Sequence, residues 1–162
     1  MKTIIHDLDN LEVGSNYYVV DACGCKNNCI GCFSCWIKHP KVCCIKDEYN
    51  NIPDKIKDSS ELIIISENRY GTYSSSVKKV LERCIGYLLP YFYISDKDKM
   101  MHHVPRYENK IKLTVLFYGD IDEEDKKCLY NLVKANSLNF DASSFEVNYY
   151  KDIGEIKNVY FD

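Results

Sequence analysis

Cysteine is concentrated in one short part of the chain. Seven of the nine cysteines lie in the segment CGCKNNCIGCFSCWIKHPKVCC, residues 23–44. Four of them have the spacing Cys29-x2-Cys32-x2-Cys35-x7-Cys43. Three closely spaced thiolates with a distal fourth are a ligand pattern for a [4Fe–4S] cluster, because short spacers let one loop wrap three corners of a cube. The spacing therefore predicts a cluster held by these four residues.

Two other states of the same thiols stay open. Structural zinc is less favoured, since its ligands usually come as two separated pairs. The thiols could also remain without a metal, in a loop with a structural role. Cys23, Cys25 and Cys44 are further candidate ligands. Cys84 and Cys128 fall on apolar stripes of predicted helices, so we expect them to be buried apolar fillers.

Length and composition predict one globular domain that spans residues 1–162, with 46% hydrophobic residues and a net charge of -3. Basic residues are interspersed among acidic ones, which argues against a nucleic-acid partner. The N-terminus reaches Asp7 and Asp9 before a signal-peptide apolar region can form, and the aliphatic run 62–65 is too short to span a membrane. We therefore expect a cytoplasmic protein, in which dense cysteines serve metal or redox chemistry more often than disulfides.

The elements that position these residues follow from the hydrophobic pattern. Strands are predicted at residues 3–5, 17–22, 61–66, 111–119 and 145–150. Helices are predicted within residues 50–60, begun by Pro53, at residues 77–88, closed by Pro90, and at residues 120–140. Residues 91–109 look irregular, and the tail after Tyr150 shows no amphipathic helix. Strands that alternate with helices predict an α/β fold with a mostly parallel sheet of about five strands.

The two faces of this sheet are expected to differ. The connection between the first two strands is long enough for a hairpin but too short for a helical crossover. The helices would then cover one face, while Lys112, Thr114, Glu146 and Asn148 lie on the other among apolar groups. We expect a partner chain to pack on that second face, as in a homo-oligomer. A solvated face is the alternative.

Three motifs carry a family resemblance: CIGCFSCWIKHPKVC, IIISENRYGTYSSSVKKVLER and KMMHHVPRYENKIKL. In them the chain resembles the flavodoxin-like NAD(P)H-dependent FMN reductases and their iron-sulfur flavoprotein branch, over about residues 29–140. The resemblance implies a doubly wound flavodoxin-like fold with FMN at the carboxyl ends of the strands. It also implies an oligomer that receives electrons from NAD(P)H or a ferredoxin-type donor.

One part of the family pattern is missing. Members have a glycine- and serine-rich phosphate loop and a helix after the first strand, but the chain has MKTIIHDLDNLEVGSN there. The fold is therefore predicted to be truncated at the first βα unit, and to lack the last helix. Without the loop, FMN loses several charge-assisted hydrogen bonds of roughly 1.5–3 kcal/mol each. Either a partner chain supplies the loop, or the chain has lost tight FMN binding.

The loop at residues 66–76 matches the family segment that cradles the flavin ring, although Glu67 stands where the family commonly has proline. Open α/β sheets bind ligands at this edge, through backbone N–H groups and aromatic side chains. The alternative is a loop that only connects a strand to a helix. The residues predicted to bind the cofactor are Asn68, Arg69, Tyr70, Gly71 and Tyr73.

The pattern identifies no catalytic residue. His102 and His103 are adjacent, and adjacent side chains rarely bind the same ion, so a structural or flavin-edge role is favoured over a metal site. Trp36 could shield a flavin or cluster, or could make a core or interface contact. The resemblance implies an FMN-dependent NAD(P)H oxidoreductase. The alternatives are a non-catalytic flavodoxin-like partner or scaffold, and a cysteine-based metal-binding module.

Overall fold

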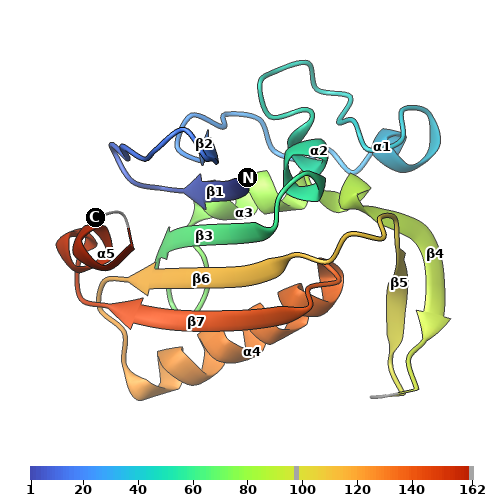
Figure 1. Cartoon of the computed structure of the whole chain (residues 1–162). Coiled ribbons are helices and arrows are strands. Elements are labelled where there is room, and N and C mark those ends of the chain that lie inside the picture. The colour runs from blue at the N-terminus through green and yellow to red at the C-terminus, as the bar shows by residue number, and fades with distance from the viewer. Residues whose placement is uncertain (97–98, 161–162) are drawn as a thin grey trace.

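A five-stranded parallel sheet forms the centre of the computed structural model (Figure 1). The structure describes residues 1–96 and 99–160, with side chains up to Ile156. The strand order is β2-β1-β3-β6-β7, and every neighbouring pair is parallel. The strands are β1 (Lys2–His6), β2 (Tyr17–Asp21), β3 (Glu61–Glu67), β6 (Lys112–Tyr118) and β7 (Ser144–Tyr150).

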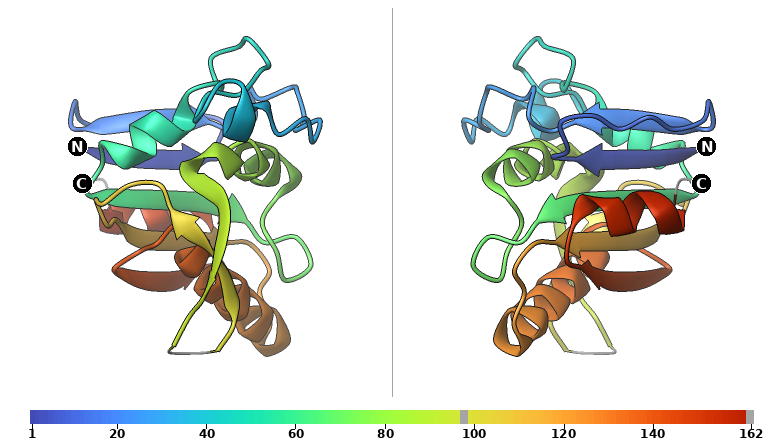
Figure 2. Two further views of the ribbon diagram at one scale, coloured as in Figure 1. Left: turned by 90° about the vertical axis from the view of Figure 1, so that its right-hand side faces the viewer. Right: turned by 90° about the vertical axis from the view of Figure 1, so that its left-hand side faces the viewer.

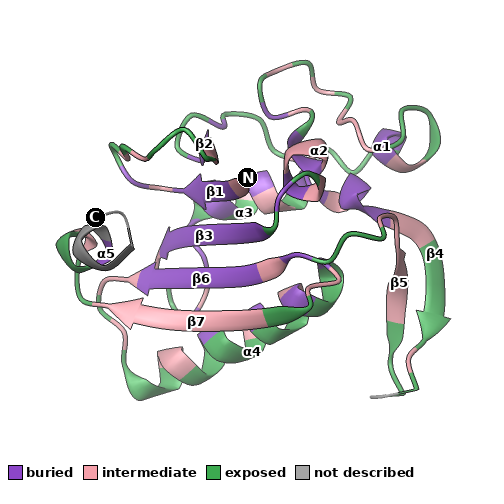
Figure 3. Cartoon of the chain, viewed as in Figure 1, coloured by how far each residue is buried: buried purple, intermediate pink, exposed green. Residues whose placement is uncertain are grey.

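All five strands expected from the sequence are confirmed, with ends that differ by a residue or two. β3 and β6 lie in the middle of the sheet and are almost fully buried (Figure 3). This burial explains the continuous aliphatic run 62–65, because a central parallel strand is covered on both faces.

The connection between β1 and β2 differs from the expected hairpin. The two strands are parallel, with Lys2 opposite Tyr17, and the connecting residues 7–16 form no helix. Leu8 is buried and Leu11 and Val13 are packed against the same apolar cluster as Ile4. The connection can therefore cross the sheet without a helix, because its own apolar side chains cover the strands. The predicted loss of the first βα unit is confirmed.

Three helices pack against the first face of the sheet, and Figure 2 shows the longest of them, in orange, below the strands. α3 (Ser75–Glu82) begins at Ser74, whose Oγ accepts a hydrogen bond from Val77 N. α4 (Glu123–Asn139) begins at Asp122, and its acidic first turn suits the positive end of the helix dipole. The shorter α2 (Ile52–Lys57) carries Pro53 in its first turn, as predicted. These helices bury their apolar stripes against the side chains of β1, β3 and β6.

The last helix, expected to be missing, is present as α5 (Ile153–Tyr160). It lies on the opposite face from α3 and α4 (Figure 2). Ile153 and Ile156 pack against the cluster that contains Ile4, Ile63 and Leu116.

Part of the second face, where a partner chain was expected, is covered by the chain itself. α5 and residues 8–13 cover its apolar part. The rest carries a ladder of charges, in which Lys2 pairs with Glu61 at 2.8 Å and Lys112 with Glu146 at 2.8 Å. Thr114 Oγ1 donates to Glu61 Oε1 at 2.6 Å. The polar residues predicted for this face therefore pair with one another.

Residues 88–94 and 101–105 form two paired antiparallel strands, a separate hairpin, where an irregular segment was expected. Its strands are β4 (Leu88–Ile94) and β5 (Met101–Pro105), which extend away from the main sheet (Figure 1). The predicted helix 77–88 therefore ends early, at Glu82, and a 3₁₀ turn η1 (Ile85–Tyr87) leads into β4. The outer part of the hairpin is exposed (Figure 3). Among the described residues, no helix is long and apolar enough to cross a membrane.

Candidate functional site

A cavity of about 560 Å³ opens at the carboxyl edge of the sheet. It is lined by Asp7, Cys23 and Glu67, and by residues 69–70, 72–76 and 78. We call it the edge cavity. The chain leaves β1 toward β2 on one side and returns to β3 on the other, so the cavity lies where the strand order reverses. Open α/β sheets bind their ligands at this kind of switch point.

The loop between β3 and α3 is held in a fixed turn. Asn68 Nδ2 donates to Asp120 O and to Asp125 Oδ2, both at 2.7 Å, and Asn68 Oδ1 accepts from Gly71 N at 3.0 Å. Gly71 has a φ of 73°, and a Cβ there would lie 3.0 Å from Cys128 Cβ. The turn therefore needs glycine at this position. Its internal bonds give the loop a defined shape before any ligand arrives.

The residues predicted to bind the cofactor are divided between the cavity and its support. Arg69, Tyr70 and Tyr73 line the edge cavity, whereas Asn68 and Gly71 are used by the turn itself. Tyr70 is 98% exposed, but Tyr73 is 2% exposed and its ring stacks on Phe117 with centroids 5.3 Å apart. Burial raises the pKa of Tyr73. Tyr70 therefore offers an open aromatic ring, while the side chain of Tyr73 belongs to the core.

Asp7 is a cavity residue that sequence reasoning missed. Its Oδ2 accepts from Glu67 N at 3.0 Å and its Oδ1 accepts from Tyr118 OH at 3.1 Å. Burial, followed by the charge of Asp7, raises the pKa of Tyr118. One carboxylate thus ties together the ends of β1, β3 and β6. The signal that could have found it is an acidic residue directly after a buried strand.

The side chains that line the edge cavity suit a flavin ring better than a flavin phosphate. The carboxylate of Asp7 stands directly after β1, and Glu67 adds a second. Arg69 Nη2 is paired with Glu67 Oε2 at 2.7 Å. No helix begins after β1 to offer its N–H groups to an anion. The side of the cavity at Asp7 and Glu67 therefore suits an aromatic, uncharged group, and the cavity's possible anion donors are the N-terminus of α3 and Lys78.

The chain was compared with known proteins in sequence and in structure, and a match was found in structure. No family model matches the chain, and no curated protein matches it in sequence. Among solved structures, the chain is similar to an FMN-dependent NADH-azoreductase from Bacillus anthracis str. Ames Ancestor in complex with FMN, with a TM-score of 0.54. The fold is flavodoxin-like. The match covers 97% of this chain and 92% of that one at 10% identity, so it confirms the predicted fold class and carries no residue roles.

The cysteine segment surrounds a second, much smaller cavity. Five cysteines line this space of about 30 Å³ together with Arg83 and Ile85, and we call it the cysteine cavity. The cysteines are the four predicted ligands Cys29, Cys32, Cys35 and Cys43, with Cys44 as the fifth.

The cysteine cavity does not fit a four-iron cluster in this arrangement. Among the described residues, no three His, Cys, Asp or Glu side chains are placed to hold a metal ion. The volume is also far below the roughly 300–1,000 Å³ of typical cofactor sites. The [4Fe–4S] cluster therefore stays a prediction from spacing.

A buried ion pair fixes the cysteine segment to the body. The Arg83 side chain is fully buried, and its two terminal nitrogens donate to Asp47 at 2.6 and 2.8 Å. This pairing lowers the pKa of Asp47 to about 2. Arg83 Nη1 also lies 3.6 Å from Cys25 Sγ. Arg83 follows α3, so the pair joins the segment to a helix of the main core.

The remaining cysteines behave differently from one another. Cys84 is buried as predicted, and burial raises its pKa to about 12. Cys128 is exposed, which corrects the prediction of a buried filler, because its side of α4 faces the β3–α3 loop at Gly71 rather than the sheet. Cys32 and Cys44 are exposed, with their Sγ atoms 3.3 Å apart.

His103 and Trp36 have structural contacts at the base of the hairpin. His103 Nδ1 is 2.8 Å from Leu89 O, and the ring lies 4.2 Å from Phe92 and 5.3 Å from Trp36, measured between centroids. Trp36, in α1 (Ser34–Ile37), donates from Nε1 to Ile85 O at 2.9 Å. These contacts support the structural role expected for the histidine, and they attach the cysteine segment to the hairpin.

Proposed function

We propose that the chain is a flavin-dependent oxidoreductase that binds the flavin ring in the edge cavity and uses NAD(P)H as its electron donor. The observation that carries the proposal is a cavity of about 560 Å³ at the β1/β3 switch point, the place where flavodoxin-like sheets bind FMN. The similar solved structure is an FMN-dependent NADH-azoreductase, which supports both the cofactor and the donor.

The chain's own residues would bind and orient the ring. Tyr70 presents an exposed aromatic ring on a turn that Asn68 fixes. The turn therefore loses little conformational entropy when a flavin ring stacks on Tyr70. Thr72 and Ser75 line the same cavity, and their hydroxyl groups would bond to polar ring edges. A bound flavin would supply two-electron transfer between a reduced nicotinamide and an acceptor.

The flavin phosphate would gain little from this site. Asp7 and Glu67 place two carboxylates at the cavity, and like charges disfavour a dianion. Lys78 and Arg69 also line the cavity, but Arg69 is already paired with Glu67. The proposal therefore assigns the binding energy to the ring, so riboflavin should bind at least as tightly as FMN.

The test is a titration of the purified chain with riboflavin and with FMN, followed by quenching of flavin fluorescence. Tyr70→Ala should weaken riboflavin binding by roughly 2- to 13-fold, because an aromatic contact contributes about 0.5–1.5 kcal/mol. Tyr130→Ala is the matched control, since Tyr130 is an exposed tyrosine on α4, outside the edge cavity. Equal losses in the two variants, or no quenching by either flavin, would contradict the proposal.

A second candidate is a non-catalytic flavodoxin-like partner or scaffold subunit. The carboxylate of Asp7 in the place of a phosphate loop favours it, because this change removes the usual anchor of FMN. The same titration separates the two functions. A chain that folds cooperatively but binds neither riboflavin nor FMN is the scaffold.

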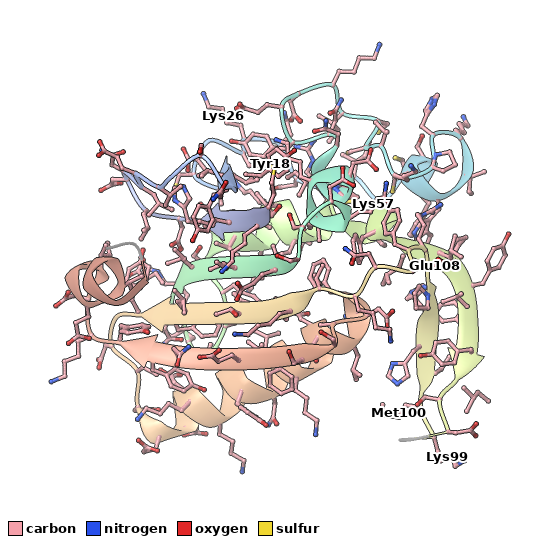
Figure 4. The ribbon with its side chains drawn as sticks, viewed as in Figure 1. Tyr18, Lys26, Lys57, Lys99, Met100 and Glu108 are labelled. Atoms are coloured by element: carbon pink, nitrogen blue, oxygen red, sulfur yellow. The ribbon has the colours of Figure 1, made fainter. Side chains whose placement is uncertain are left out.

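The homo-oligomer is proposed to form through the hairpin rather than through the second sheet face. Lys99 and Met100 lie at the hairpin tip, away from the sheet (Figure 4). Large apolar side chains are exposed along both strands, which is uncommon on a surface that stays in water. They are Tyr91, Phe92, Tyr93, Ile94, Met100 and Met101. Light scattering tests the proposal: Phe92→Lys should lower the mass of an oligomer, and a wild-type monomer would refute it.

A further inference from the structure

Two exposed thiols are in contact at the cysteine cavity. Cys32 and Cys44 lie far apart in the segment, yet their Sγ atoms are 3.3 Å from each other. A disulfide bond joins sulfur atoms at about 2.05 Å, so an approach of roughly 1.2 Å would bring this pair to bonding distance. Both residues are exposed, so a small molecule can reach them from solvent. Cys35 and Cys84, in contrast, are buried.

The surroundings hold the two thiols near each other. Phe33, next to Cys32, stacks on Trp36 with ring centroids 5.2 Å apart, and Trp36 is bonded to the backbone of η1. Next to Cys44, the backbone N–H of Cys43 donates to the carbonyl oxygen of Asn50 at 2.8 Å. Because both flanks are anchored, attack by the thiolate of one cysteine on a mixed disulfide at the other would cost little chain entropy.

The buried Arg83–Asp47 pair also anchors the loop that carries Cys44. Asp47 is three residues beyond Cys44, and its carboxylate accepts hydrogen bonds from both terminal nitrogens of the Arg83 guanidinium. Arg83 itself lines the cysteine cavity. The loop that carries Cys44 is therefore fixed to the end of α3.

We propose that Cys32 and Cys44 form a reversible redox dithiol that reacts with low-molecular-weight disulfides. This site is separate from the edge cavity and does not depend on flavin binding.

The reaction is thiol–disulfide exchange in two steps. The thiolate of one cysteine attacks a sulfur of the small disulfide RSSR, which forms a mixed disulfide and releases RS⁻. The thiolate of the other cysteine then attacks the protein sulfur of the mixed disulfide and releases the second RS⁻. The protein loses two electrons and two protons and gains one intramolecular disulfide, while RSSR is reduced to two RSH.

The test uses the full chain, reduced and kept under anaerobic conditions, with oxidised glutathione as the probe. Wild type should lose two of its nine titratable thiols, should retain no glutathione, and should yield a Cys32–Cys44 peptide on mapping. Cys44→Ser should accumulate glutathione on Cys32, because the resolving thiol is gone. Cys23→Ser is the matched control, since Cys23 is also exposed, and it should still form the disulfide.

Three results would overturn the proposal. The new disulfide could map to another pair, or Cys44→Ser could carry no more glutathione than wild type. The anaerobic protein could also contain iron and sulfide that Cys32→Ser removes, which would make Cys32 a cluster ligand. Mapping of wild type needs no variant, so the proposal stays testable even if a serine variant fails to fold.

Discussion

Asp47→Asn removes the negative charge that faces the buried guanidinium of Arg83. The wild-type carboxylate accepts two short bonds, at 2.6 and 2.8 Å, from a side chain with no exposed surface. Breaking a buried ion pair costs about 3–5 kcal/mol, because one charge is left buried without a counter-charge. The asparagine oxygen keeps one of the two bonds, and Asp47 is 22% exposed. We therefore expect the free energy of unfolding to fall by about 2–3 kcal/mol.

The assay is equilibrium unfolding in urea, in which the midpoint should fall while the slope stays unchanged. Asp58→Asn is the control, because the Asp58–Lys57 pair is exposed and should contribute less than about 1 kcal/mol. The pKa of Asp47 is about 2, below its value of about 3.9 in an unfolded chain, so its contribution is present above about pH 4 and is lost as the pH falls toward 2. Equal effects of the two substitutions would refute the assignment.

Three other predictions concern single residues of the sheet edge and the turn. Burial lowers the pKa of His6, so the folded chain holds the neutral ring. The free energy of unfolding should therefore fall as the pH drops below about 6.5, and should fall less in His6→Gln. Urea midpoints measured from pH 8 to 5.5 test this. Asp7→Asn should increase the affinity for FMN relative to riboflavin by about three- to tenfold, because one like charge is removed; an unchanged ratio of dissociation constants would place the phosphate elsewhere. Gly71→Ala should destabilise the chain by more than about 1 kcal/mol in urea, because of its φ of 73°, whereas Gly14→Ala, with open space around its Cβ, should not.

The sheet could be predicted because its strands are defined by local patterns. The aliphatic run 62–65 identifies a buried strand whatever its partners, and Asp122 and Ser74 mark helix starts through their side-chain oxygens. The direction of β2 could not be predicted in this way. It depends on Leu8 and Leu11 covering the sheet, a tertiary contact that has no signature in the spacing of the connection.

The edge cavity was predicted only in part, for a similar reason. The β3–α3 loop is continuous in sequence, so its position after a central strand could be inferred. Asp7 comes from another strand, and its bonds to Glu67 N and Tyr118 join residues far apart in the chain. The contact between Cys32 and Cys44 also depends on the fold, because the spacing pattern pointed to Cys43 as the fourth member.

The central claim is that the edge cavity binds a flavin ring, and amide shift mapping by NMR tests it most directly. Riboflavin added to the labelled chain should shift the amide signals of residues 69–76 and of Asp7, which line the cavity or its turn. Signals of the hairpin at residues 88–94 should stay in place. Shifts confined to the hairpin, or no shifts at saturating riboflavin, would contradict the account.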